Sequence, residues 1–292
     1  MKIQTFSIVA GGTACNAHCP FCISKMTPTQ GVTPKAPNIN WRNFQKACLL
    51  AKQCGVTTVM ITGKGEPTLY PEQVSAYLLN IEKYNFPIIE LQTNGIIFGR
   101  EQKKCDRYLH QWYQMGLTTI SISVAHYSQE RNQKIYLPDG PIYPSLGELV
   151  IFLHNIGFSV RLSCVLMNGY IDNDIDLGTL VRKCHALDIE QLTLRPVNKP
   201  IHPDMSDEMK IWFIENHIRL EQLNIIEDYL KTHGTQIMKL THGGVVYDLD
   251  GQNVCLGNSL TIDSNSEELR QLIFFPDGHL RYDWQYEGAI LL

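Results

Sequence analysis

The sequence predicts an α/β fold built on a parallel sheet. Hydrophobic periodicity switches repeatedly between the strand period and the helix period, giving six strand-then-helix units in succession. The strand segments are almost continuously apolar or β-branched, as in a parallel sheet covered by helices. A doubly wound sheet and a (β/α) barrel both fit this order, and periodicity alone does not choose between them.

The six units follow one another along the chain without a low-complexity segment or a Gly/Ser linker. The first strand, "IQTFSIVA", leads into a cysteine-rich loop, and the helix "NWRNFQKACLLAKQCG" comes next, with Asn40 as its N-cap and Gly55 at its end. The remaining units are predicted as strand 56–63 with helix 72–85, strand 88–93 with helix 103–115, strand 118–125 with helix 145–156, strand 158–167 with helix 174–187, and strand 189–197 with a long helix beginning near Asp207.

Two segments depart from this alternation. Residues 126–144, rich in Tyr, Pro and Gly, are predicted to form a long loop after the fourth strand, and such loops in compact domains are often functional. After about residue 234 the pattern changes to short β-like pieces, one with a PDG turn. We therefore expect a core domain over 1–233 and a small C-terminal β appendage over 234–292, packed on that core.

Composition excludes several classes of protein. The chain has 292 residues, 44% of them hydrophobic and 18% charged, which is typical of an ordinary globular protein. A formal charge of −4 with both signs dispersed gives no general electrostatic reason for a nucleic-acid partner. The N-terminal apolar run is too short and too polar for a signal peptide, and no window approaches the roughly 18 apolar residues of a membrane span. A cytoplasmic location without membrane contact is expected.

Three cysteines within eight residues form the most informative motif. Cys15, Cys19 and Cys22, spaced C-x3-C-x2-C, lie on the loop after the first strand. Disulfides are disfavoured in a reducing compartment, and nine cysteines cannot all be paired. Structural zinc normally takes four protein ligands, and the six other cysteines are scattered. Ligation of a four-iron cluster by three cysteines remains, with one iron left for another ligand.

This motif, with Phe21 directly before its third cysteine, resembles the C-x3-C-x-aromatic-C signature of the radical S-adenosylmethionine (radical SAM) superfamily. The resemblance implies a partial (β/α)6 barrel, a [4Fe-4S] cluster and S-adenosylmethionine bound to the open iron. It also implies reductive cleavage of that cofactor to a 5′-deoxyadenosyl radical. The implied partners are an electron donor such as flavodoxin or ferredoxin and a small-molecule or peptide substrate that loses a hydrogen atom.

Later segments are similar to further family motifs. "TGKGEPTL" after the second strand resembles the segment that binds the cofactor's amino group; Gly65, Glu66 and Pro67 match, whereas Lys64 stands where a glycine is usual and Gly63 precedes it. "LQTNG" at the end of the third strand resembles the family's T-N-G, which would place Thr93 and Asn94 at the cofactor's rim.

The last three predicted strands contribute single polar residues. Ser121 and Ser123 share one face of the fourth strand, where family members often use a polar residue for the cofactor. Arg161 in the fifth strand and Arg195 at the end of the sixth are also counted as cofactor contacts, and Arg195 could meet a carboxylate, a phosphate or a structural acid. His18, inside the cysteine loop, is expected to be exposed.

Several functions compete with a hydrogen-abstracting radical SAM enzyme. Within the superfamily they are a glycyl-radical-enzyme activase and a nucleotide-modifying enzyme. The GTP-cyclising enzyme of molybdenum-cofactor synthesis and the multi-cluster peptide-maturing enzymes are disfavoured, because they need further grouped cysteines. From other classes come a non-catalytic iron–sulfur protein, which would want a fourth protein ligand, and a zinc-stabilised binding module.

Overall fold

The computed structural model describes residues 2–28, 31–35, 38–140, 143–197, 207–240, 242–257 and 268–292. Its strands are β1 (Ile3–Val9), β2 (Thr58–Thr62), β3 (Ile88–Thr93), β4 (Thr119–Val124), β5 (Ser159–Leu166), β6 (Gln191–Pro196), β7 (Thr235–Lys239), β8 (Val245–Leu249), β9 (Gln252–Leu256), β10 (Leu269–Phe274) and β11 (Leu280–Arg281). Its α-helices are α1 (Trp41–Gln53), α2 (Pro71–Ile81), α3 (Ile96–Arg100), α4 (Gln102–Gln114), α5 (Gln129–Tyr136), α6 (Leu146–Ile156), α7 (Asp174–Ala186), α8 (Asp207–Asn216) and α9 (Leu220–His233).

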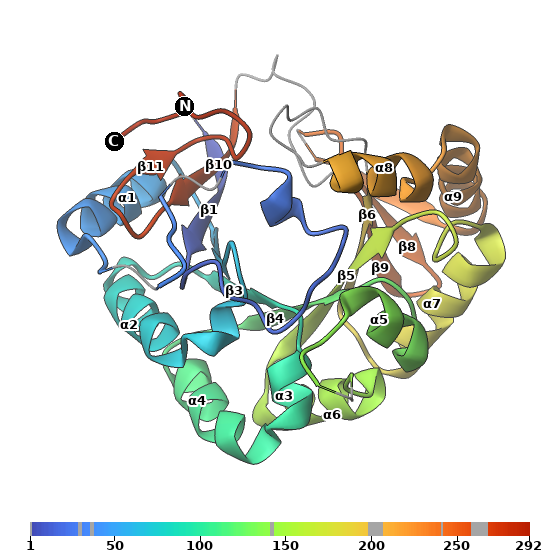
Figure 1. Ribbon diagram of the computed structural model, residues 1–292, viewed down its shortest axis with the longest axis horizontal. Helices are drawn as coiled ribbons and strands as arrows, with labels where there is room; N and C mark the ends of the chain where they lie inside the picture. The colour runs from blue at the N-terminus through green and yellow to red at the C-terminus, as the bar shows by residue number, and fades with distance from the viewer. Residues whose placement is uncertain are drawn as a thin grey trace.

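All the described strands belong to one curved sheet, in the order β11-β10-β1-β2-β3-β4-β5-β6-β9-β8-β7. Neighbouring strands are parallel from β10 through β9, and antiparallel strands flank this block at both edges. The helices lie around the outside of the curve (Figure 1). Because β11 and β7 are edges rather than neighbours, the sheet does not close, and the predicted partial barrel is confirmed.

The alternation of side chains along the strands explains the two faces of this sheet. In β5, Val160, Leu162, Cys164 and Leu166 are buried and join the core beneath the helices. The intervening positions of β5, among them Arg161 and Ser163, are half-buried and point to the opposite, concave face. The concave face therefore carries polar side chains, whereas the convex face carries the apolar core.

The first helix shows how local sequence determines an element. Asn40 caps α1, because its side-chain oxygen accepts a hydrogen bond from the backbone N–H of Asn43, 3.1 Å away. Phe44, Cys48 and Ala51 lie on one face of the helix and are fully buried in the core. The predicted N-cap is confirmed.

Two predicted segments differ from the structure. The predicted loop 126–144 contains helix α5, which begins after its N-cap Ser128 and buries Asn132, Ile135 and Tyr136. The long helix expected from Asp207 consists of two helices, α8 and α9. The break falls at His217, which forms an isolated β-bridge with Met167 directly after β5. A tertiary contact thus ends α8 at a place where the sequence contains neither glycine nor proline.

The C-terminal strands extend the sheet at both edges. β9 pairs in parallel with β6 and carries β8 and β7 outward, whereas β10 pairs in parallel with β1 and carries β11. The last β segments therefore add to the same sheet that the first six strands form. The division into domains at residue 233 stays a prediction. Among the described helices, none has the length and apolar character needed to cross a lipid bilayer.

Candidate active site

The cysteine loop lies across the mouth of the curved sheet, at the C-terminal ends of the strands (Figure 1). All three cysteines are free and only partly buried. Burial, reinforced by the charge of Glu66, raises the pKa of the Cys15 thiol to about 11, and burial together with the neighbouring Cys22 and Cys15 raises that of Cys19 further. Cys15 and Cys19 thus stay protonated until a metal displaces the protons.

Three thiols on one short loop supply the donor set of a [4Fe-4S] cluster with one iron open. Among the residues that the structure describes, no three His, Cys, Asp or Glu side chains are already gathered as a metal site. The chemistry of the loop nevertheless fits the cluster, since Cys15, Cys19 and Cys22 interact electrostatically with one another. The other six cysteines occupy separate places along the chain, namely Cys48, Cys54, Cys105, Cys164, Cys184 and Cys255.

Gly65 allows the turn after β2 to press against the cysteine loop. A Cβ atom at Gly65 would lie 2.0 Å from the carbonyl oxygen of Ala14, a distance that no real contact shows. That same carbonyl accepts a hydrogen bond from the backbone N–H of Glu66, 3.0 Å away. Pro67 then begins a short 3-10 helix, and a Cβ atom at Gly63 would lie 2.9 Å from the carbonyl oxygen of Gly65. Glycine is therefore required where the two loops meet.

Glu66 is the buried centre of this region. Its Oε1 accepts hydrogen bonds from the backbone N–H and hydroxyl of Thr68, 3.0 and 2.7 Å away, and from the hydroxyl of Thr93 at 2.7 Å. Its Oε2 accepts from the backbone N–H of Asn94 at 2.9 Å. Burial raises the pKa of the carboxyl group, and these four hydrogen bonds oppose that rise.

Asn94 joins the end of β3 to the cysteine loop. Its amide nitrogen donates to Asn16 Oδ1 at 2.7 Å and lies 3.8 Å from Cys15 Sγ, while its Oδ1 accepts from the backbone N–H of Ile96 and so holds the start of α3. The predicted residues Cys15, Glu66, Thr93 and Asn94 are thus brought together. We call these four residues, with Asn16, the mouth group.

Lys64 occupies the position where the family usually has a glycine. Its ammonium group donates to the Thr27 hydroxyl, just beyond the cysteine loop, and lies 5.4 Å from the ring centre of Trp284. Burial lowers the pKa of Lys64 to about 8, against the opposing charge of Cys22. The departure therefore has a structural role, because Lys64 joins the turn after β2, the cysteine loop and the C-terminal segment.

Helix α5 supports the cysteine loop from the other side. Phe21 packs edge-on against Tyr136, with ring centres 5.2 Å apart, and the Tyr136 hydroxyl lies 2.8 Å from Ser123 Oγ. The backbone N–H of His18 donates to the carbonyl of Tyr136, and the exposed His18 ring lies 2.7 Å from Asp139. Sequence reasoning missed Tyr136, whose only signal is an aromatic residue in the segment predicted as a loop.

The remaining predicted residues form a second group, deeper on the concave face. Arg161 pairs with Glu90 and donates to Gln191, and Arg195 donates to Ser163. None of these bonds reaches Glu66 or the cysteine loop. We call Arg161, Arg195, Arg270 and Glu90 the arginine group. Ser121 is buried on the same face, in register with Arg161 of the neighbouring strand.

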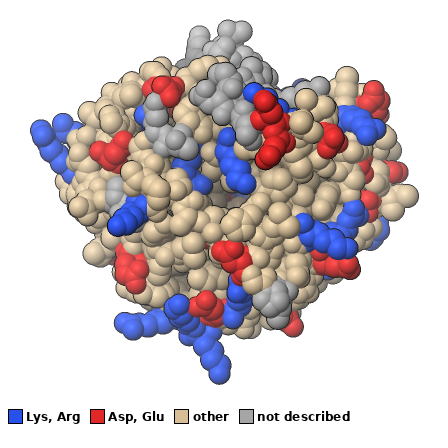
Figure 2. All heavy atoms as spheres, viewed as in Figure 1, with Lys and Arg blue, Asp and Glu red and all other residues tan. Residues whose placement is uncertain are grey.

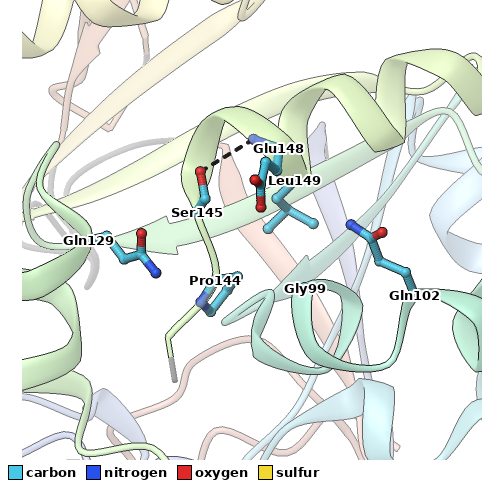
Figure 3. A pocket seen from close by; sticks show the side chains of 7 residues that line it. All are labelled: Gly99, Gln102, Gln129, Pro144, Ser145, Glu148 and Leu149. Atoms are coloured by element: carbon cyan, nitrogen blue, oxygen red, sulfur yellow. Dashed lines mark hydrogen bonds between the residues drawn. The ribbon is translucent and has the colours of Figure 1, made fainter. Parts of the chain in front are cut away.

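A separate hollow of about 350 Å³ lies outside this region, between α3, α5 and α6 (Figure 3). It is lined by Gly99, Gln102, Gln129, Pro144, Ser145, Glu148 and Leu149. Its polar groups serve the helix ends: Ser145 Oγ accepts from the backbone N–H of Glu148 to cap α6. No residue predicted for the site lies on its wall.

The chain is similar to proteins of known activity over part of its length. GTP 3′,8-cyclase from Aquifex aeolicus is 28% identical over 189 residues, 60% of this chain and 54% of that protein. The molybdenum cofactor biosynthesis protein moc-5 from Caenorhabditis elegans is 23% identical over 198 residues, 67% of this chain and 31% of that protein. The chain therefore spans about half the length, or less, of these curated relatives.

Solved structures show the same fold. Streptococcus suis SuiB bound to S-adenosylmethionine has a TM-score of 0.61 and 12% identity, covering 96% of this chain and 60% of that one. A radical SAM methyltransferase from Sphaerobacter thermophilus has a TM-score of 0.52 and 19% identity, covering 77% and 63%. The model of the Radical SAM superfamily matches residues 9–182, more than half of the chain and all of the mouth group. The chain belongs to the radical SAM superfamily.

Proposed function

We propose that this radical SAM enzyme abstracts a hydrogen atom from a small-molecule or peptide substrate held at the mouth of its partial barrel. Enzymes of the superfamily bind a [4Fe-4S] cluster and S-adenosylmethionine. When bound, these groups supply the one-electron cleavage that yields a 5′-deoxyadenosyl radical. The single observation that carries the proposal is the convergence of Cys15, Glu66 and Asn94 from three neighbouring strand ends.

The chain's own residues have separable tasks in this proposal. Cys15, Cys19 and Cys22 hold the cluster. Glu66 fixes the backbone of Asn94 and the hydroxyl of Thr93, so the rim facing the cofactor is already ordered before the cofactor binds.

Three further residues are proposed to line the cofactor site. Ser121 faces the concave side of β4, and Ser123 is held there by Tyr136. Phe21, packed on Tyr136, shields the cysteine loop from water.

Members of the superfamily act on different substrates, and the similarity to GTP 3′,8-cyclases indicates one of them. The curated relatives include GTP 3′,8-cyclases, and a nucleotide substrate is the second candidate that this similarity favours. Among the described residues, however, the six cysteines outside the loop are not gathered into a second cluster-binding set. We therefore propose hydrogen abstraction without assigning GTP cyclisation.

The test begins with anaerobic reconstitution of the full chain with iron and sulfide. With S-adenosylmethionine and dithionite we expect 5′-deoxyadenosine and methionine in equal amounts. Cys19→Ala should lose the cluster's absorbance and this product. Cys54→Ala is the matched control, because Cys54 lies at the end of α1 and is also partly buried; it should retain both.

Three outcomes would contradict the proposal. Zinc in place of iron would indicate a binding module. A stable cluster that never cleaves S-adenosylmethionine, with candidate substrates present, would indicate an electron-transfer or sensor protein. Equal loss of the cluster in Cys19→Ala and Cys54→Ala would show that the loop is not the ligand set.

A further inference from the structure

Two arginines of neighbouring strands lie on the concave side of the sheet, and a third, Arg270, interacts electrostatically with one of them, Arg195. Arg161 lies near the start of β5, Arg195 near the end of β6, and Arg270 in β10 at the other side of the opening. Arg195 Nε donates to Ser163 Oγ at 3.0 Å, and Ser163 lies on the concave face of β5. The Arg195 side chain therefore lies over the interior of the partial barrel rather than in solvent.

The three arginines differ in whether a carboxylate lies beside them. Arg161 Nη1 lies 2.8 Å from Glu90 Oε2, and the Glu90 side chain is fully buried. Gln92 also donates to Glu90, through its other oxygen at 3.0 Å. Arg270 interacts electrostatically with Asp283. Arg195 has the neutral hydroxyl of Ser163 as its hydrogen-bond partner among the described residues. Among the described residues, Arg195 is thus the member of the arginine group whose hydrogen-bond partner is neutral.

A positive charge in a partly buried place is costly unless a counter-charge reaches it. Burial lowers the pKa of Arg195, and the nearby Arg161 lowers it further against the favourable charge of Glu90. Burial lowers the pKa of Arg270 to about 10, and repulsion by Arg195 adds to this effect. Arg195 and Arg270 are therefore close enough to repel each other across the interior. A bound anion would relieve both costs.

The position of this group suits a ligand that enters from the mouth. Arg195 pairs in register with Val165, four residues beyond Arg161 in β5, so it lies nearer to the strand ends where (β/α) barrels bind their substrates. Figure 2 shows the face viewed in Figure 1 as spheres, with a hollow near its centre and basic side chains beside it. Arg161 and Arg195 are themselves half-buried on the concave face, so they are not sealed within the core.

We propose that Arg195, with Arg161 and Arg270, binds a carboxylate or phosphate group of the substrate inside the partial barrel. Planar guanidinium groups bind both anions through paired N–H donors. The inference rests on the proposed function, because it places the anionic part of the substrate below the mouth group, where hydrogen abstraction would occur. Glu90 then has a positioning role, since it holds Arg161 in place.

Isothermal titration calorimetry on the reconstituted protein, saturated with S-adenosylmethionine, tests this assignment with two probes. Inorganic pyrophosphate represents phosphate groups, and citrate represents carboxylates. We expect at least one probe to bind the wild-type chain, and its identity to distinguish the two sources. Arg195→Gln should weaken that binding roughly ten- to hundredfold, the range expected for a charged hydrogen-bonding partner. Arg195→Lys should weaken it less, because the charge remains.

The matched control is Arg182→Gln, an exposed arginine of α7 that bonds only to Thr179 on its own helix. It should bind the probe like the wild-type chain. Arg270→Gln is a second variant on another strand, so a folding defect of Arg195→Gln, detected by circular dichroism, does not end the test. Arg270→Gln should also weaken the binding of the probe.

The assignment is overturned if neither probe binds the wild-type protein, or if both arginine variants bind as tightly as the Arg182→Gln control. It is also overturned if Arg195→Gln weakens S-adenosylmethionine and leaves the probe unaffected, because Arg195 would then be a cofactor residue. The release of 5′-deoxyadenosine in the absence of substrate is measured in parallel. Its persistence in Arg195→Gln would show that failure of the anion site leaves the proposed reaction standing.

Discussion

The mouth group and the arginine group lie on the same sheet, yet they are assembled in different ways. The mouth group comes from three short motifs that directly follow β1, β2 and β3, which are neighbours in the sheet. The arginine group takes single residues from β3, β5, β6 and β10, without any local motif. The mouth group is built mainly from hydrogen bonds between loops, and the arginine group from charges within strands. The mouth group matches the proposed cofactor site, and the arginine group matches the proposed anion site.

The largest expected effect is at Gly65. Gly65→Ala should separate the turn after β2 from the cysteine loop, because the added carbon would overlap the Ala14 carbonyl and neither backbone can yield freely. We expect nearly complete loss of bound iron and of 5′-deoxyadenosine, with a stability loss of about 3 kcal/mol. Iron content measures the loss of the cluster, and thermal unfolding measures the loss of stability.

Gly288→Ala is the control for this substitution, because nothing lies within 4 Å of its added carbon. It should leave iron binding unchanged. A Gly65→Ala protein that retained its iron would show that the two loops do not need this close approach.

The next effect is at Glu90 and concerns stability. Glu90→Gln should destabilise the protein by about 2–3 kcal/mol, because the partly exposed Arg161 would lose the buried charge that it faces. Iron binding by the folded protein should be preserved, since Glu90 does not contact the mouth group. Urea unfolding and iron content together separate the two regions.

Glu130→Gln provides the comparison with a surface pair. Glu130 lies 2.8 Å from Lys134, but both side chains are largely exposed, so the cost should be about 0.5 kcal/mol or less. Equal costs at Glu90 and Glu130 would argue against a buried charge in the arginine group.

An intermediate effect is expected from the titration of His126, which precedes α5. Burial lowers the pKa of His126 to about 4 from its ordinary 6.5, with Arg131 adding to the shift. Between these values the unfolded chain binds a proton that the folded chain does not, so folding stability should fall as the pH drops from 6.5 towards 4. The contribution is at most about 3 kcal/mol.

His126→Asn should reduce this pH dependence, measured as unfolding free energy at several pH values. His110→Asn is the control, because His110 lies exposed on α4. Identical pH profiles for the wild-type and His126→Asn proteins would contradict the buried, neutral state of the ring.

The smallest effect is at Tyr136. Tyr136→Phe should cost about 1 kcal/mol, because Ser123 loses its hydroxyl partner while the ring contact with Phe21 remains. Thermal unfolding should show this loss, and iron binding should hardly change. Tyr113→Phe, at a half-exposed ring on α4, should cost nothing measurable. A large loss of iron in Tyr136→Phe would mean that the hydroxyl, rather than the ring, supports the loop.

Much of the core and of the mouth group could be predicted from sequence, because both depend on short-range patterns. Asn40 caps α1 through a hydrogen bond to a residue only three positions later, and the motifs of the mouth group directly follow their strands in the sequence. Helix α5 was missed because its buried residues are few and mostly polar or aromatic. The end of α8 depends on the contact between His217 and Met167, which no local pattern reveals. The arginine group depends on the order in which distant strands pair, and a single sequence does not contain that order.

The pairing of β10 with β1 has a consequence for biosynthesis. Ser7 contacts Gln271, a partner 264 residues later, and β1 leads directly into the cysteine loop. While the chain emerges from the ribosome, one edge of β1 stays unpaired until almost all of the described chain has been made. Such late, non-local pairing is intrinsically slow and leaves a strand edge exposed to other chains. Delivery of iron and sulfur to the nascent chain would therefore meet a loop whose supporting strand is still half-built.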